Sequence, residues 1–140
     1  MKIMGLSFSK ISGERFSNLP EGLKINTKID VLEIGKVDSG DISVEGEVLG
    51  IKFLYELDYS PKFAIITTEG NLLLALGSKE AKDVLERWGK KEMSEDFRLT
   101  IFNIVLKKAG LKALQLEEEL NLPSHFQLPV LKKSEEPKDV

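Results

Sequence analysis

The hydrophobic period of this chain changes once, at Gly77. Before that glycine, apolar residues alternate with polar ones in four runs, which is the period of half-buried β-strands. After it, apolar residues recur at i, i+3, i+4 and i+7, the spacing of an amphipathic helix. A run of strands followed by a run of helices predicts an α+β domain with four long strands and two to three helices.

The first two strands are expected near residues 4–8 and 23–34. Gly13 is expected to lie in a turn after the first strand, because glycine commonly interrupts regular structure. The second strand alternates regularly until Leu32 and Ile34, where the apolar residues change phase. A single unpaired residue shifts the phase in this way, so we expect a β-bulge or the end of the strand there.

The third and fourth strands are expected over residues 41–59 and 63–76, after a turn at residues 38–41. The third is long and bent, with a bulge at Leu49-Gly50 where its apolar phase also changes. The fourth is interrupted at residues 69–71. Those three residues form either a hairpin turn between two short strands or a bulge in one long strand, and the pattern does not distinguish the two.

Two helices follow the strands. Ser78 is the expected N-cap of the first helix, which ends at Gly89, and Ser94 is the expected N-cap of the second. The second helix, over residues 94–109, has an apolar stripe that suits packing on a sheet. This stripe consists of Phe97, Ile101, Ile104 and Val105.

A second apolar stripe on the same helix consists of Leu99, Phe102, Leu106 and Ala109. One sheet cannot cover a helix that is apolar over so much of its circumference. We therefore expect these four residues to form the interface of a homo-oligomer.

Beyond Gly110, which is expected to interrupt the helix, a helical or nearly helical run continues to Asn121. Residues 122–130 are expected to be extended, because two prolines in this segment are incompatible with a helix interior. Residues 132–140 are charged and carry no core-forming pattern, so we expect a disordered tail. The domain is therefore expected to comprise residues 1–131.

Composition excludes several classes of protein. A chain of 140 residues without cysteine has no thiolate chemistry, disulfides or cysteine-based zinc sites. A net charge of −3 disfavours nucleic acid as a partner. The N-terminal residues lack the apolar core of a signal peptide, and no stretch approaches the roughly 20 apolar residues of a membrane span. We expect a cytoplasmic protein that does not insert into membranes.

No catalytic, cofactor or metal site is predicted. His125 is the only histidine, and the sequence does not indicate a partner for it. Glu117, Glu118 and Glu119 are consecutive, so on a helix they point about 100° apart and do not converge on one ion. We expect these three glutamates to lie on a solvated face of the helix.

Four segments together resemble an archaeal family of SecB-like proteins, distantly related to the bacterial export chaperone SecB. These segments are LSFSKISGER (6–15), LDYSPKFAIITTEGNLLLAL (57–76), LERWGKK (85–91) and IFNIVLKKAGLKALQLEEELNLPSHFQLPVL (101–131). The resemblance implies an antiparallel four-stranded sheet with helices on one face, assembled as a dimer or a dimer of dimers. It also implies an ATP-independent chaperone that holds unfolded clients, with a link to protein export.

The functional hypothesis is therefore a non-enzymatic chaperone for unfolded or extended polypeptides, which bind in apolar grooves between a sheet edge and the C-terminal segment. The expected peptide-binding residues are Leu122, Phe126, Leu128 and Val130. A buried core strand is the alternative interpretation of this segment. The rival function is an oligomeric module that binds one specific folded protein, and the range of clients distinguishes the two.

Overall fold

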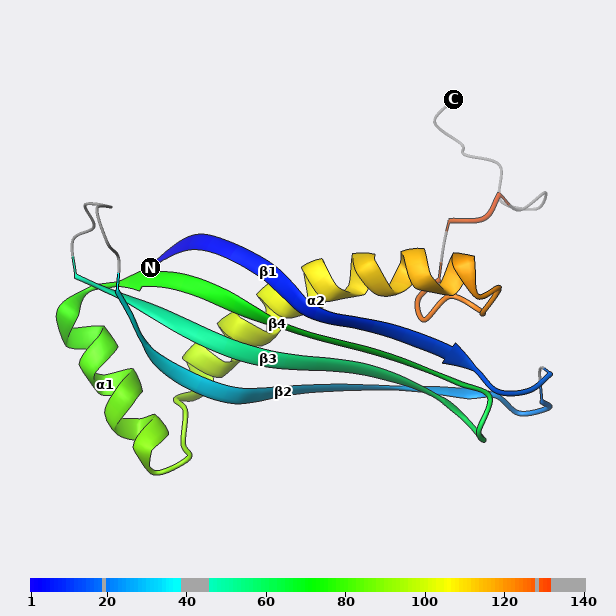
Figure 1. Ribbon diagram of the computed structural model, residues 1–140, viewed down its shortest axis with the longest axis horizontal. Helices are drawn as coiled ribbons and strands as arrows, with labels where there is room; N and C mark the ends of the chain where they lie inside the picture. The colour runs from blue at the N-terminus through cyan, green and yellow to red at the C-terminus, as the bar shows by residue number, and fades with distance from the viewer. Residues whose placement is uncertain (19, 39–45, 128, 132–140) are drawn as a thin grey trace.

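The computed structural model describes residues 1–18, 20–38, 46–127 and 129–131. Within these residues, four strands precede two helices (Figure 1), which confirms the predicted α+β class. The elements are β1 (Lys2–Arg15), β2 (Lys24–Val37), β3 (Glu47–Ser60), β4 (Ala64–Leu76), α1 (Ser78–Gly89) and α2 (Glu95–Glu119).

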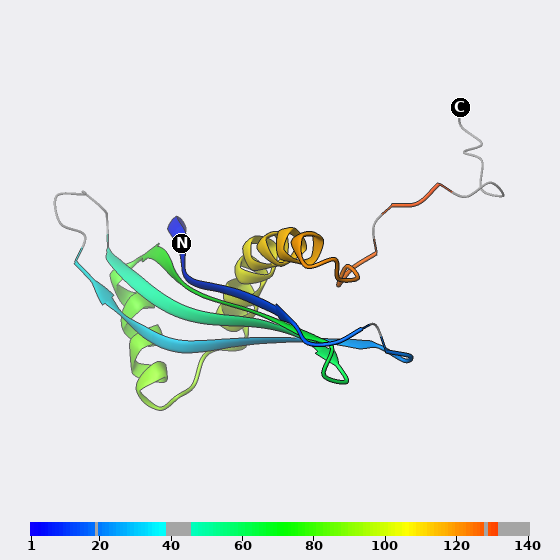
Figure 2. The ribbon, with the colours of Figure 1, turned by 45° about the vertical axis from the view of Figure 1, so that its right-hand side comes forward.

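The strands form one antiparallel sheet in the order β1-β4-β3-β2, so β3 and β4 are central. Alternate residues of these two strands are buried, from Leu49 to Tyr59 on β3 and from Ala64 to Leu76 on β4. They form a single hydrophobic core with the inward residues of both helices. Both helices lie on the same side of the sheet (Figures 1 and 2).

One predicted bulge is confirmed and another is wrong. On β2 the register shifts between Val31 and Glu33, so Leu32 is the extra residue, as the change of apolar phase predicted. On β3, by contrast, every residue around Leu49 pairs in register with both neighbouring strands. Val48 and Leu49 are consecutive and therefore point to opposite faces, yet both are buried. The change of phase here reflects burial on both faces, not an inserted residue.

Residues 64–76 form one continuous strand, so the hairpin alternative is excluded. Gly70 lies at its centre, paired with Phe8 on β1 and Phe53 on β3. The rings of these two phenylalanines pack edge to face, with centroids 6.1 Å apart. A Cβ atom on Gly70 would lie 2.3 Å from the Ser7 carbonyl oxygen and 2.7 Å from Phe53 Cζ. Only glycine fits this position without displacement of its neighbours.

The strand β1 is longer than expected and contains the irregularities that were expected in β4. Its register with β4 shifts between Ile3 and Gly5 and between Phe8 and Lys10. Gly13 lies inside β1, not in a turn, which corrects the prediction. A Cβ atom there would approach Leu120 Cδ1 to 2.8 Å, so the side chain of Leu120 takes the space that a larger residue would need.

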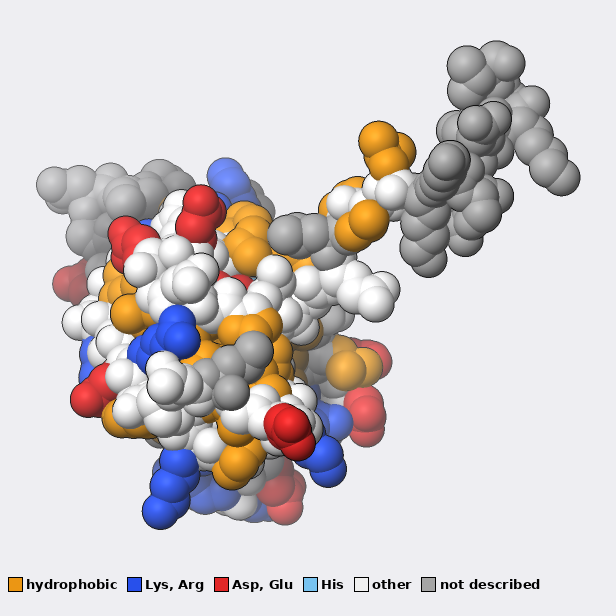
Figure 3. Space-filling view, turned by 90° about the vertical axis from the view of Figure 1, so that its right-hand side faces the viewer, with side chains coloured by type: hydrophobic (Ala, Val, Ile, Leu, Met, Phe, Trp, Pro, Cys, Tyr) orange, Lys and Arg blue, Asp and Glu red, His pale blue; other side chains and the backbone are white. Residues whose placement is uncertain are grey.

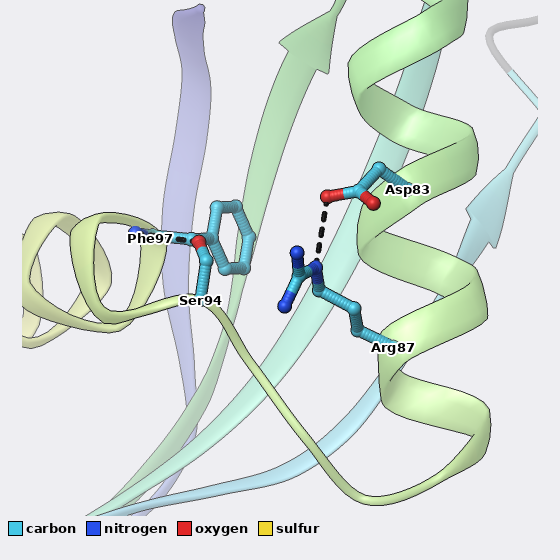
Figure 4. A network of polar contacts seen from close by, with 4 residues as sticks. All are labelled: Asp83, Arg87, Ser94 and Phe97. Carbon is cyan, nitrogen blue, oxygen red and sulfur yellow. Dashed lines mark hydrogen bonds and ion pairs between the residues drawn. The ribbon is translucent and has the colours of Figure 1, made fainter.

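The helix caps agree with the sequence in one case of two. Ser94 is the N-cap of α2, since its Oγ accepts a hydrogen bond from the backbone N–H of Phe97 at 3.2 Å (Figure 4). Ser78 is already the first residue of α1, and Gly77 occupies the N-cap without a side-chain bond. Figure 4 also shows the ion pair of Asp83 and Arg87 on α1, at 3.1 Å.

A single helix, α2, covers the range in which Gly110 was expected to cause a break. Its buried residues recur at every fourth position, with Gly110 as an additional buried residue. The fourfold row consists of Phe97, Ile101, Val105, Ala109, Ala113 and Glu117. A row of i+4 residues is inclined to the helix axis by about 26°, so the face turned towards the sheet rotates along α2. Gly110 lies in the middle of α2, where the imidazole of His125 comes close to the helix backbone.

After α2 the chain reverses and returns along the helix. Asn121 adopts a positive φ of 55°, and the backbone N–H of Leu122 donates to the Glu117 carbonyl at 2.7 Å. Arg15 of β1 donates to the carbonyls of Leu120 and Asn121 at 3.2 and 3.0 Å. We call residues 121–127 the strap. They contain neither helix nor strand, whereas the expected tail at 132–140 and most of the turn at 38–41 fall outside the described residues.

We predict that Gly70→Ala lowers the free energy of unfolding by about 3 kcal/mol, because the new methyl group has no room. Urea denaturation of the purified protein measures this change. Gly35→Ala on β2 is the matched control, since no atom lies within 4 Å of its Cβ position. Equal stability of the two variants would contradict the tight packing described at Gly70.

Candidate functional site

Glu117 is a buried carboxylate whose two oxygens bind two different parts of the protein. Its side chain comes from α2, and the residue is 1% exposed. Tyr59 of β3 donates its hydroxyl to Oε2. On the other side, His125 of the strap lies with Nδ1 at 2.9 Å from Oε1. A carboxylate oxygen is the acceptor in such a pair, so the contact is a hydrogen bond when Nδ1 of His125 carries the proton. Sheet, helix and strap therefore meet at one side chain.

Two tyrosines face this carboxylate from β3. Burial, together with the negative charge of Glu117, raises the pKa of Tyr55 to about 12. Burial, the hydrogen bond to Glu117 and its charge together raise the pKa of Tyr59 well above the usual range. Both phenols remain protonated at neutral pH, so the hydroxyl of Tyr59 is a permanent donor to Glu117.

The predicted solvated face of three glutamates is wrong for Glu117, although Glu118 and Glu119 are exposed. The sequence did carry a signal for this. Glu117 continues the fourfold row that contains Ala109 and Ala113, and every earlier member of that row is apolar. A partner for His125 was also not predicted, because the seven residues between it and Glu117 include a chain reversal.

The strap lies against the outside of α2 at Gly110. A Cβ atom on Gly110 would lie 3.7 Å from Nε2 of His125, which is van der Waals contact. Phe126 packs edge to face on the same imidazole, with ring centroids 4.9 Å apart. Gly110 is four residues, or about one helical turn, beyond Leu106. The structure therefore brings the predicted peptide-binding segment next to the predicted oligomer interface.

Two of the four predicted interface residues are exposed on α2, and a third is partly buried and packs against the core. Leu99 and Leu106 are 48% and 42% exposed, and Phe102 is partly buried beneath the guanidinium of Arg98 at 5.6 Å. We call Leu99, Phe102 and Leu106 the outer stripe. Ala109 is fully buried in the core of the chain and is not part of this stripe.

The predicted peptide-binding residues differ in their surroundings. Leu122 is buried in the core, as the alternative interpretation of this segment expected. Phe126 is 44% exposed and Val130 76% exposed, whereas Leu128 lies outside the described residues. Figure 3 shows hydrophobic side chains on the projecting C-terminal segment and between charged groups on the adjoining face of the protein.

Among the hollows of the described residues, one lies beside Glu117 and another lies beside α1. One, of about 320 Å³, lies at the C-terminal end of α2; Glu117, Leu122 and Ser124 are among its lining residues. A larger hollow of about 510 Å³ lies between α1 and the ends of β2 and β3, beside the ion pair of Lys36 and Glu47. Only the first hollow adjoins the buried network.

Within the described ranges, no cluster of three or more histidine, cysteine, aspartate or glutamate side chains is arranged to hold a metal ion. Neither helix in the part of the chain that the structure covers is long and apolar enough to cross a membrane.

Comparison with known proteins places the fold. No family model matches the sequence, and no curated protein matches it. Among solved structures, the chain is similar to the SecB-like chaperone Rv1957 of Mycobacterium tuberculosis, in complex with a ChAD peptide from the Rv1956 HigA1 antitoxin. The superposition has a TM-score of 0.58 and 15% sequence identity, and covers 94% of this chain and 89% of that chain. The chain has a SecB-like fold. The sheet and helices implied by the sequence resemblance are thus confirmed.

We predict that Tyr59→Phe lowers the free energy of unfolding by about 2 kcal/mol, because a buried carboxylate loses a donor. Urea unfolding at pH 7 measures the loss. Tyr55→Phe removes a hydroxyl from the same face of β3 without removing a bond to Glu117, so its cost is expected to be below about 1 kcal/mol. Equal losses would contradict the role assigned to the Tyr59 hydroxyl.

Proposed function

We propose that this protein is an ATP-independent chaperone that binds unfolded or extended polypeptides on an apolar surface and works in the cytoplasm as a homo-oligomer. The observation that carries the proposal is the adjacency of the outer stripe and the strap. Leu99 and Leu106 on α2, and Phe126 on the strap, are each more than two-fifths exposed. Large exposed apolar areas on soluble proteins are characteristic of binding surfaces.

The SecB-like fold supports this proposal. The similar structure, Rv1957, is named as a chaperone and is bound to a peptide. Extended peptides suit such a protein, because apolar side chains of a client bury against the surface without a requirement for one sequence. The resemblance to bacterial SecB adds a link to protein export to the proposal.

A second function is supported by the same comparison. The peptide bound to Rv1957 comes from one antitoxin, which favours a module dedicated to a single partner. The two functions differ in client range. A general chaperone suppresses the aggregation of reduced insulin and of heated citrate synthase, which are unrelated proteins. A dedicated module suppresses neither, and that result would exclude the general role.

We predict that Phe126→Ser weakens the suppression of aggregation of both clients while the melting temperature changes by less than about 2 °C. The side chain is 44% exposed, so its removal leaves no large cavity. Light scattering of the clients and thermal unfolding of the variant measure the two effects. Unchanged suppression would remove Phe126 from the binding surface, whereas a large loss of stability would assign it to the core.

We predict that Leu106→Glu dissociates the homo-oligomer, because the interface would bury an unpaired carboxylate. Light scattering at micromolar concentration gives the mass of wild type and variant. Gln115→Glu introduces the same charge at an exposed position of α2 outside the outer stripe and is expected to leave the assembly intact. A monomeric wild-type protein would refute the proposed assembly.

A further inference from the structure

We infer that the strap is a hinged lid over the apolar surface of α2, and that the bond between His125 and Glu117 holds the lid closed. This inference rests on the proposed function and concerns the regulation of the same surface. Neither the fold nor the resemblance requires it. It follows from the way in which the two ends of the strap are attached.

The proximal end of the strap is firmly attached. Leu122 is buried in the core, and its backbone N–H bonds to the carbonyl of Glu117 at 2.7 Å. Arg15 of β1 binds the carbonyls of Leu120 and Asn121. The side chain of Arg15 is itself placed over the ring of Phe63, at 5.0 Å. These contacts join the end of α2 to the sheet whether or not the distal part of the strap moves.

The distal part of the strap depends on one side chain. Within residues 123–127, the contact of His125 with Glu117 is the one hydrogen bond that the structure contains. Phe126 packs on the imidazole of His125, so its position also depends on that bond. A hinge therefore lies between Leu122, which is buried, and the residues that follow it.

The closed lid covers α2 at the end of the outer stripe. His125 lies over Gly110, one helical turn beyond Leu106. When the strap swings away, the backbone of α2 at Gly110 becomes accessible beside Leu106. A client that enters there lies between α2 and Phe126, which remains available as the apolar contact of the lid.

The bond is suited to a reversible latch because Glu117 has a second donor. When His125 leaves, the carboxylate keeps the hydroxyl of Tyr59, and the adjoining hollow of about 320 Å³ gives water access to the free oxygen. The carboxylate is therefore not left unpaired in the core, which would make opening too costly. One hydrogen bond to a charged group changes a closed-to-open ratio by about tenfold or more.

The test uses His125→Ala in the full chain. The control is Glu119→Gln, at an exposed position at the end of α2. Chymotryptic cleavage after Phe126, followed by mass spectrometry, reports the lid, because cleavage in the open state tracks the open fraction. Fluorescence anisotropy with labelled, reduced and carboxymethylated α-lactalbumin, which stays unfolded, reports binding. We expect cleavage to rise about tenfold and the Kd to fall about fivefold or more, because the open fraction sets the apparent affinity.

His125→Asn provides the rescue, since its side-chain amide places a donor near the position of Nδ1. Both readouts are expected to return towards the wild-type values. A purely structural strap would give faster cleavage with unchanged or weaker binding, and this result would overturn the inference while the proposed function stands. Unchanged cleavage would show that the bond is no latch. Failure of wild type and all variants to bind the probe would overturn the proposed function, and regulation with it.

A second pair of variants tests the lid without substituting any residue of the buried network. Gly110→Leu places a branched side chain where the ring of His125 lies, whereas Gly110→Ala adds only a methyl group at contact distance. The leucine variant is expected to show the faster cleavage and tighter binding of His125→Ala, and the alanine variant the cleavage rate of wild type. If both variants are cleaved and bind like wild type, the position assigned to His125 beside Gly110 is wrong.

Discussion

The row of buried residues along α2 is the contact on which the rest of this structure depends. Its members are spaced by four residues, so the row winds around the helix and the outward face winds with it. In the N-terminal half of α2, the outward face carries the outer stripe. At the C-terminal end of α2, the buried row ends with Glu117. One packing geometry therefore leaves Leu99 and Leu106 exposed and also directs a carboxylate into the core. The apparent second stripe in the sequence is a consequence of this rotation.

A carboxylate at the end of an apolar row is costly unless each oxygen has a donor. The protein meets this requirement with groups from two different layers, Tyr59 from the sheet and His125 from the strap. The raised pKa of Tyr59 keeps its donor in place at any physiological pH. The two donors differ in attachment. Tyr59 lies near the end of β3 but is paired with both neighbouring strands, whereas His125 belongs to a segment without regular structure. The carboxylate therefore joins the sheet to the strap.

The sequence was sufficient where a local pattern had one physical cause. The change of phase at Leu32 predicted a real bulge, and Ser94 was identified as a cap from its position before acidic residues. The same change of phase at Leu49 was misinterpreted, because burial of Val48 on the other face produces an identical pattern. The outer stripe and the C-terminal segment were identified separately. Their adjacency depends on the chain reversal at Asn121, and the pairing of Glu117 with His125 depends on it too, so neither was predictable from spacing.

A likeness of 15% identity establishes the arrangement of strands and helices but says nothing of the surface. In the proposed function, a second copy of the chain, a client and the strap would all occupy the outer face of α2. Two occupants that exclude each other from one surface are thermodynamically linked. If the first lowers the affinity of the protein for the second by some factor, the second lowers the affinity for the first by the same factor. A contact that closes the strap must therefore also lower the affinity for clients. In the proposed regulation, Glu117, which lies in the core, is the residue through which that linkage acts.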